Sequence, residues 1–253
     1  MDELDIDLCL ATKNSFSTLP SILHSIRNQT YFDNTRLLVA DNKSNDGTLN
    51  ELKKYNFTEI ISYDDESPED GFNKLLKKDQ NNLKIIISSD DWLSKNYLKA
   101  FALTAKKLKK KGIKKFILLP MFYKNIGYRG LKIDLPLPIF LLNFIGICRG
   151  IGFGVYAENG KIPLFTKDIK FASDFEYLIK CLKDKFYFKY VFCRYYHNKN
   201  GRSAQNWDEA LKEEKNISLK YNKSLLSRKF VKCIFGLKYI LKKNKNLQFS
   251  SKY

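Results

Sequence analysis

Short apolar segments alternate with longer amphipathic segments along the first 120 residues of the chain. The apolar segments are rich in β-branched side chains, as buried strands are. They cover residues 5–12, 36–41, 58–63, 83–88 and 114–119. The amphipathic segments carry an apolar residue at every third or fourth position, which is typical of helices that bury one face. They cover residues 18–29, 47–55, 69–78 and 93–110. This alternation predicts an α/β fold, with a mainly parallel Rossmann-like sheet and helices on both of its faces.

Polar and acidic side chains follow the ends of four of the predicted strands. The four ends read Thr12-Lys13-Asn14, Asp41-Asn42, Tyr63-Asp64-Asp65 and Ser89-Asp90-Asp91. Ligands of such sheets bind beyond the carboxyl ends of the strands, so these residues are candidates for a binding site. The sequence has no GxGxxG after the first strand and no GxxxxGK followed by Ser or Thr. It therefore lacks the phosphate loops of dinucleotide-binding domains and P-loop enzymes.

The net charge of +18 is concentrated in the second half of the chain. Residues 1–110 hold 16 Lys and Arg against 17 Asp and Glu, so the basic excess lies in residues 111–253. Such a one-sided field suits an anionic surface or an anionic ligand. It would also suit a nucleic-acid-binding protein whose aromatic side chains stack on bases. The acidic strand ends argue against that class, and we expect no nucleic-acid partner.

The cysteines and the N-terminal segment indicate the compartment. Five widely separated cysteines include no CxxC pair, which argues against a disulfide framework and against a zinc site. The first residues are acidic where a signal peptide would be basic, and no apolar run reaches the ~18 residues of a spanning helix. These features predict a cytoplasmic protein.

Two segments of the second half are candidates for contact with lipid. Residues 134–156 are apolar and rich in Pro and Gly, which fits either a buried connection or a surface that meets a lipid-linked substrate. Residues 224–243 predict a basic amphipathic helix. Its apolar face holds Leu226, Phe230, Ile234, Leu237 and Leu241. Such a helix either packs on the domain with a solvated basic face or lies on an anionic membrane.

Residues 40–48 read ADNKSNDGT and resemble the D-(D/N)-x-S-x-D-x-T signature of family 2 glycosyltransferases. Other pieces follow in the order of that family. ATKNSFSTLPSILHSIRNQTY resembles its first strand and helix, DGFNKLL (70–76) its DAxNKG helix, SSDDWL (88–93) its metal-binding region, FASDFEYLIKCL (171–182) its acidic segment and RYYHNKNGRSAQNW (194–207) its closing segment. The resemblance covers residues 5–205, and its strength is the ordered set of motifs.

The resemblance implies an inverting enzyme with the GT-A fold, which uses a nucleotide-sugar donor, most often a UDP-sugar. It implies a glycosyltransferase domain over residues 1–210, with a nucleotide-sugar half (1–110) and an acceptor half (111–210). A basic helical extension (211–253) would follow. The acceptor would be a saccharide or a lipid-linked molecule of bacterial surface polysaccharide synthesis, met at the inner face of the cell membrane.

Four donor-binding residues are also implied by the resemblance. Asp41 would accept a hydrogen bond from the base of the nucleotide, because an ionised carboxylate is an acceptor only. Thr12 and Asn14 would lie near the nucleoside, and Lys74 would reach the nucleotide or its diphosphate. The alternatives are a local turn held by Asp41 and a merely solvated Lys74.

The diphosphate leaving group implies a second set of residues. By the resemblance, Asp90 and Asp91 bind Mn²⁺ or Mg²⁺, which would neutralise the charge that grows on the diphosphate bound at Asp90. The family has a further acid where this chain has Ser88. The alternative is that Asp90 caps the helix predicted from residue 93. His197 or Arg202 would close over the diphosphate, unless His197 is only a surface-loop residue.

Asp174, in ASDFE, matches the general base of the family. Inverting transfer needs one carboxylate that takes the proton of the acceptor hydroxyl. Ser173 stands where the family commonly has Glu, and Glu176 is expected to face elsewhere. The alternative for Asp174 is an N-cap of a helix over 175–182. For the whole chain, the alternatives are a nucleotidyltransferase and a GT-A protein without activity.

Overall fold

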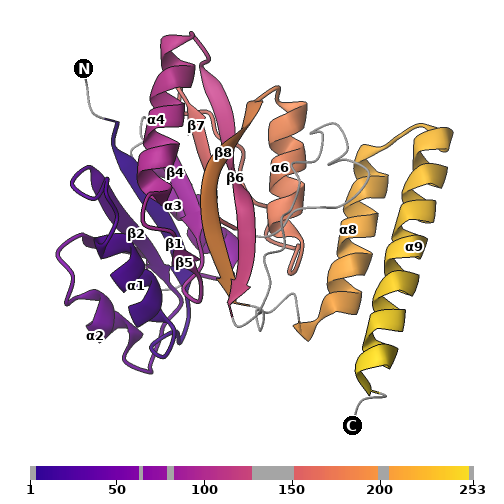
Figure 1. Ribbon diagram of the computed structural model, residues 1–253, viewed down its shortest axis with the longest axis horizontal. Helices are drawn as coiled ribbons and strands as arrows, with labels where there is room; N and C mark the ends of the chain where they lie inside the picture. Colours follow the sequence, from indigo (N-terminus) through magenta and orange to yellow (C-terminus); the bar gives the residue numbers. More distant parts are fainter. Residues whose placement is uncertain (1–3, 63–64, 79–82, 127–150, 199–204, 251–253) are drawn as a thin grey trace.

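The computed structural model describes residues 4–62, 65–78, 83–126, 151–198 and 205–250 (Figure 1). Residues 134–150 of the predicted lipid-facing segment and Arg202 lie outside these ranges. The described chain forms one curved sheet with helices on both faces, and two further helices extend the molecule at one side (Figure 1).

Eight strands form the sheet in the order β3-β2-β1-β4-β7-β6-β8-β5. They are β1 (Ile6–Thr12), β2 (Thr35–Asp41), β3 (Thr58–Ser62), β4 (Leu83–Ile87), β5 (Trp92–Leu93), β6 (Lys115–Ile126), β7 (Phe153–Ala157) and β8 (Tyr187–Asn198). The strands from β3 to β4 pair in parallel, as the sequence predicts. β7 is antiparallel to both neighbours and β5 is antiparallel to β8, whereas β6 and β8 are parallel. The sheet is therefore parallel in the first half of the chain and mixed in the second.

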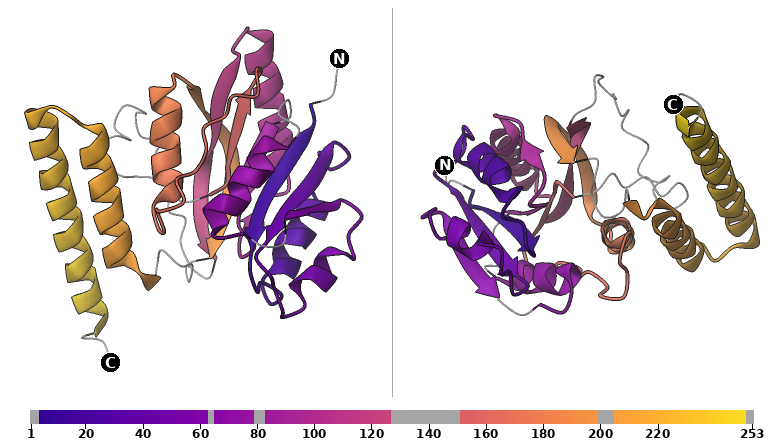
Figure 2. Two further views of the ribbon diagram at one scale, coloured as in Figure 1. Left: turned by 180° about the vertical axis from the view of Figure 1, so that it is seen from behind. Right: turned by 90° about the horizontal axis from the view of Figure 1, so that it is seen from below.

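Helices bury both faces of the sheet, which confirms the predicted architecture. α1 (Leu19–Arg27), α2 (Thr48–Leu52) and α4 (Tyr97–Lys110) cover one face, and α3 (Pro68–Lys77) and α6 (Ser173–Lys183) cover the other (Figure 2). Successive residues of β1 serve different cores, because side chains alternate along a strand. Leu8 packs under α1 and α4, and Cys9 packs under α3 and α6.

Two C-terminal helices lie beyond α6. α8 (Trp207–Tyr221) packs Ile217 against Phe175 and Ile179 of α6. α9 (Leu225–Ser250) lies on the far side of α8 (Figure 2). The boundary predicted between residues 210 and 211 falls inside α8. Among the helices of the described residues, α9 included, none combines the length and apolar character that crossing a bilayer requires.

The helix predicted from residue 93 begins only at Tyr97, with Asn96 as its N-cap. Trp92 and Leu93 instead form β5, which pairs with Tyr196 and Tyr195 of β8. The idea that Asp90 caps this helix is therefore wrong, because a strand separates the two.

A buried ion cluster crosses the sheet at the end opposite to the predicted site. Asp7 of β1 pairs in register with Arg36 of β2 and Lys84 of β4. Its carboxylate accepts a hydrogen bond from Arg36 Nε at 2.7 Å and binds Lys84 Nζ, and neither Asp7 nor Lys84 is exposed. Buried charges persist only when they are paired, so this cluster fixes the register of three parallel strands.

Candidate functional site

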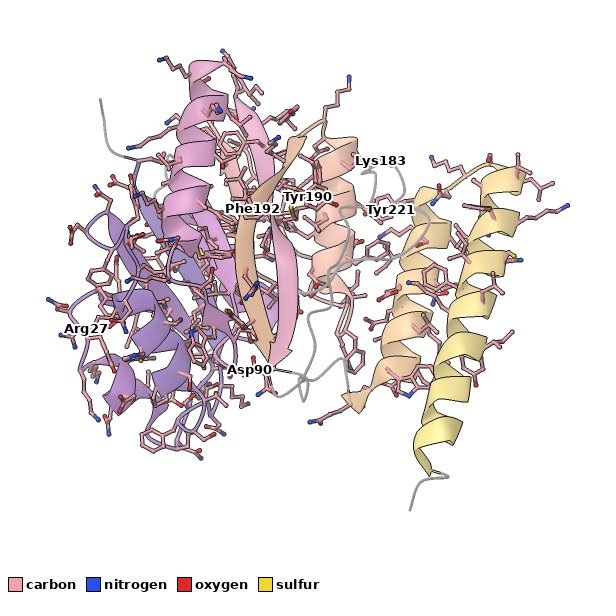
Figure 3. All side chains as sticks on the ribbon, in the orientation of Figure 1. Arg27, Asp90, Lys183, Tyr190, Phe192 and Tyr221 are labelled. Atoms are coloured by element: carbon pink, nitrogen blue, oxygen red, sulfur yellow. The ribbon has the colours of Figure 1, made fainter. Side chains whose placement is uncertain are left out.

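The predicted site residues gather at one rim of the sheet. β1, β2 and β4 end there, and Asp90 marks the rim in Figure 3. α6 begins at this rim, because Lys183 near its other end lies at the far side of the sheet (Figure 3). The bond from Lys115, at the start of β6, to the carbonyl oxygen of Asp184 fixes that far end. Asp174, in the first turn of α6, is thus on the rim with Asp90.

Hydroxyl groups connect the ends of β1 and β4. Thr12 Oγ1 donates to Ser15 Oγ at 2.8 Å, and Ser89 Oγ donates to the same oxygen at 2.9 Å. The backbone N–H of Ser15 donates to Thr48 Oγ1 at the start of α2, also at 2.8 Å. Thr12 therefore belongs to a chain of short polar side chains, in the place where dinucleotide-binding domains have a glycine-rich phosphate loop.

Asn14 and Asp41 both hold the loop after β2. Asp41 is fully buried, and its carboxylate accepts hydrogen bonds from the backbone N–H (2.9 Å) and the hydroxyl (2.6 Å) of Ser44. Asn14, at a φ of 48°, donates its backbone N–H to Ser44 Oγ at 2.8 Å, in a left-handed conformation that Asn tolerates. The turn offered as the alternative for Asp41 is present. A base can reach this fully buried carboxylate only if the groups that cover it shift.

Asp91 is anchored to the end of β8. It is 3% exposed, and one carboxylate oxygen accepts a hydrogen bond from the Tyr195 hydroxyl at 2.8 Å and lies 3.2 Å from His197 Nδ1. The other oxygen accepts the backbone N–H of Asn198 at 3.1 Å. His197 thus meets Asp91, as part of a buried cluster and not as a bare surface residue. A cation would have to displace these partners to reach Asp91.

Asp90 has a different environment from its neighbour. It is partly exposed at the rim, and its carboxylate accepts a hydrogen bond from Ser88 Oγ. Partial burial, followed by the negative charge of Asp91, raises the pKa of the Asp90 carboxyl. Within the described part of the chain Asp90 forms no salt bridge. Asp91 is therefore held by three partners, whereas Asp90 receives the Ser88 hydroxyl and stays partly exposed at the rim.

Asp90 and Ser88 fit a divalent cation that is held mainly by its substrate. A carboxylate oxygen and a hydroxyl are hard ligands of the type that Mg²⁺ and Mn²⁺ accept. The described residues contain no cluster of three or more His, Cys, Asp or Glu side chains that would hold a metal alone. The remaining ligand positions of such a cation would fall to diphosphate oxygens and water.

The DGFNKLL segment forms much of α3 and joins the two halves of the chain. Gly71 lets this helix approach the sheet, since a Cβ there would lie 2.9 Å from the Cβ of Ala40. Asn73 exchanges two hydrogen bonds with the backbone of Phe165, at 3.0 and 2.8 Å. The segment therefore sets the position of the loop before α6.

Lys74 pairs with acids of the rim. Its Nζ lies 2.8 Å from Asp65 and 3.3 Å from Asp70, and Lys167 binds the other oxygen of Asp70 at 2.8 Å. The predicted contact of Lys74 with a nucleotide would compete with these ion pairs. Lys74 therefore faces the rim and is paired with acids there, so it is not merely solvated.

Asp174 lies in the first turn of α6, whose N-cap is Ala172. The N-cap role considered for Asp174 is therefore wrong, although one of its oxygens accepts the N–H of Phe175 at 2.7 Å. Ser173, which stands where the family commonly has Glu, donates its hydroxyl to Glu69 Oε1 of α3 at 2.8 Å. A carboxylate thus lies beside Ser173, and it comes from a different element.

Sequence reasoning missed Tyr195 and Glu69. Tyr195 is fully buried and binds Asp91, which is 104 residues earlier in the chain. Glu69 stands in the first turn of α3, where an acid is usual because it favours the helix dipole. Neither residue breaks its local pattern, so the sequence carried no signal for its long-range partner.

Comparisons with known proteins agree with the motifs. The family model described as glycosyl transferase family 2 matches residues 7–114, which run from β1 to the end of α4 and include Thr12, Asp41 and Asp90. No curated protein sequence matches the chain.

Solved structures share the fold. S. aureus TarS in complex with UDP-GlcNAc is 17% identical with a TM-score of 0.65, and the match covers 92% of this chain and 70% of that chain. The mannosyltransferase PcManGT from Pyrobaculum calidifontis, in complex with GDP-Man and Mn²⁺, is 14% identical with a TM-score of 0.64, over 94% of this chain and 70% of that chain. At these identities the likeness establishes a common GT-A fold.

Replacing the two adjacent acids by Asn should change the stability of the ligand-free protein in opposite directions. Asp90→Asn removes a carboxyl whose ionisation the fold disfavours, so the free energy of unfolding at pH 7 should hold or rise. Asp91→Asn disturbs three buried contacts and should cost about 1–3 kcal/mol. Urea unfolding measures both.

The pH dependence provides the control. Because the pKa of Asp90 is raised on folding, the wild type should lose stability relative to Asp90→Asn as pH rises from the unfolded to the folded pKa. Equal destabilisation by the two substitutions would contradict the different roles of Asp90 and Asp91.

Proposed function

We propose that this chain, which residues 7–114 identify as a family 2 glycosyltransferase, transfers a sugar with inversion from a nucleotide-sugar donor to an acceptor hydroxyl. The observation that carries the proposal is the carboxylate of Asp90, which lies at the rim without a salt bridge to the described residues, beside the buried and satisfied Asp91. Such a carboxylate suits a site in which a cation binds together with the substrate.

The donor lies across the ends of β1, β2 and β4 in this proposal. Thr12 and Asn14 adjoin the nucleoside, and Asp41 accepts the N–H of the base once the groups that cover its carboxylate have shifted. Asp90 would hold Mn²⁺ or Mg²⁺ together with Ser88, and the cation would neutralise part of the negative charge of the diphosphate. Binding of UDP-GlcNAc and GDP-Man by the similar TarS and PcManGT supports a nucleotide-sugar donor, and we favour a UDP-sugar.

Three basic residues complete the proposed diphosphate side. Lys74 would exchange its ion pairs with rim acids for the diphosphate. His197, held beside Asp91, or Arg202 would close over the same group.

Asp174 acts as the general base in the proposed reaction. The acceptor oxygen bonds to the anomeric carbon as the bond from that carbon to the diphosphate oxygen breaks on the opposite face. The acceptor proton passes to the Asp174 carboxylate, and the electron pair of the broken bond leaves with the diphosphate. An α-linked donor therefore gives a β-linked product. We propose a saccharide or lipid-linked acceptor in bacterial surface polysaccharide synthesis.

Nucleotide binding and turnover test this proposal separately. In a thermal-shift panel of UDP, GDP and CDP, one nucleotide should raise the melting temperature only when Mn²⁺ or Mg²⁺ is present. Asp174→Asn should keep that shift and lower the release of nucleoside diphosphate from the matching sugar donor by about 10²-fold or more.

Asp184→Asn is the matched control, because Asp184 is exposed at the other end of the same helix. It should leave both measurements unchanged. If no nucleotide raises the melting temperature, the donor site is wrong; if Asp174→Asn turns over normally, the base is another residue.

We further propose that α9 holds the enzyme against an anionic membrane surface. Val231 and Phe235 are buried on the side of α8. Leu226, Phe230 and Leu237, which belong to the predicted apolar face, are 80%, 50% and 56% exposed. One apolar side of α9 therefore packs against the protein, and a second apolar side is exposed.

Basic side chains occupy other parts of the surface of α9. Arg228, Lys229 and Lys232 are all exposed. Each basic residue near an anionic lipid surface contributes about 1 kcal/mol of attraction. Apolar insertion with basic flanks is the pattern of helices that lie in a membrane interface.

Vesicle sedimentation tests the membrane proposal. The wild type should bind phosphatidylglycerol vesicles and not phosphatidylcholine vesicles. Phe230→Ser with Leu237→Ser should weaken binding by tenfold or more, since each apolar side chain buried contributes about 1.5–3 kcal/mol. Phe192→Ser is the control, because Phe192 is 78% exposed on β8, away from α9. Unchanged binding of the double variant, or equal loss in the control, would contradict the proposal.

A further inference from the structure

The turn that leads into Asp174 is held by a carboxylate from α8. Glu213 Oε1 accepts the backbone N–H of Lys170 at 3.2 Å. Its Oε2 accepts the N–H groups of Phe171 at 2.8 Å and Ala172 at 3.1 Å. The N-cap residue of α6 makes no side-chain capping bond of its own. A side chain 41–43 residues later in the chain therefore binds the N–H groups just before the helix.

A second carboxylate holds the same turn from the opposite half of the chain. Glu69, in the first turn of α3, is 3% exposed and accepts the hydroxyl of Ser173 at 2.8 Å. The residues immediately before Asp174 are therefore fixed from two sides. α3 holds them from the donor half, and α8 holds them from the C-terminal part of the chain.

A carboxylate of α6 also binds side chains of α8. Glu176, in the first turn of α6, is fully buried. Its Oε1 accepts hydrogen bonds from Lys220 at 3.0 Å and from the Tyr221 hydroxyl at 3.2 Å, and Lys180 lies 3.1 Å from its Oε2. These contacts lie further along both helices than the contacts of Glu213, and α8 runs beside α6 with the same polarity (Figure 1). The contacts of Glu213 and those of Glu176 therefore fix the alignment of α6 and α8 at two points along the helices.

We infer that Glu213 is a positioning residue for the transfer reaction and that α8 belongs to the catalytic unit. The inference rests on the proposed role of Asp174 as the base. Glu213 touches neither donor nor acceptor, and it acts by holding the three N–H groups before the helix that carries Asp174. A displacement of about 1 Å in a reacting group can lower a rate by about 10²-fold, so loss of this support should reach the chemistry.

Hydrogen exchange and steady-state kinetics of the full chain test the inference together. Glu213→Ala should speed amide exchange at Lys170, Phe171 and Ala172. It should also lower kcat for nucleoside diphosphate release by about 10- to 100-fold, with KM for the donor nearly unchanged. Glu213→Gln keeps one acceptor oxygen and should recover part of the lost kcat.

Glu214→Ala is the matched control on the same helix. Glu214 pairs with Lys238 of α9 at 3.0 Å, whereas the N–H groups of residues 170–172 are bound by Glu213. This variant should keep wild-type exchange at the three amides and wild-type kcat.

Three outcomes would overturn the inference. The first is unchanged exchange at residues 170–172 in Glu213→Ala, and the second is a loss of donor affinity equal to the loss of kcat. The third is full activity of Glu213→Ala beside an inactive Asp174→Asn, which would leave the proposed function standing. An active Asp174→Asn would instead remove the proposed base and this inference with it.

Discussion

The site depends on the buried carboxylate of Asp91. By binding Tyr195, His197 and the backbone of Asn198, it ties the end of β4 to the end of β8. The seat of Tyr195 in turn requires glycine at position 152, where φ is +103° and a Cβ would lie 2.7 Å from the tyrosine ring. With Asp91 committed to the interior, the preceding residue, Asp90, is left at the rim. The two adjacent acids are thereby separated: Asp91 holds the sheet together, and Asp90 is the one for which we propose contact with a ligand.

The two ends of the sheet differ in how their acidic side chains are paired. The Asp7 cluster, at the opposite end of the sheet, pairs its buried acid with two basic side chains, as stability requires. At the rim, burial and Asp91 raise the pKa of Asp90, and no salt bridge of the described residues offsets this. An unfavourable carboxylate is retained where a bound cation would relieve it, and such perturbed groups are concentrated at functional sites. The same rim also gathers α3 and α6, so the contacts of Glu69 and Glu213 bring the proposed base under the control of two distant elements.

The local pattern of apolar and polar residues was sufficient to predict most helices and strands and the position of the rim. The apolar runs of β1, β2 and β4 and the three-to-four spacing of α1 and α3 are set by burial within each segment, so the sequence reveals them. Trp92 and Leu93 fit the end of a helical pattern equally well, and only their pairing with β8 makes them a strand. The roles of Asp91 and Glu213 were beyond the sequence for the same reason, because their partners lie 104 and about 40 residues away. The motifs located the acids, and tertiary contacts decided which acid is buried and which lies at the rim.

The central claim is that Asp90, and not Asp91, meets the cation and the diphosphate. Mn²⁺ binding in the presence of UDP, followed by electron paramagnetic resonance of the free ion, tests it most directly. The account predicts a UDP-dependent Mn²⁺ site in the wild type whose affinity falls by about tenfold or more in Asp90→Asn, in a protein that is still folded. Equal Mn²⁺ affinity in the wild type and in Asp90→Asn would contradict it.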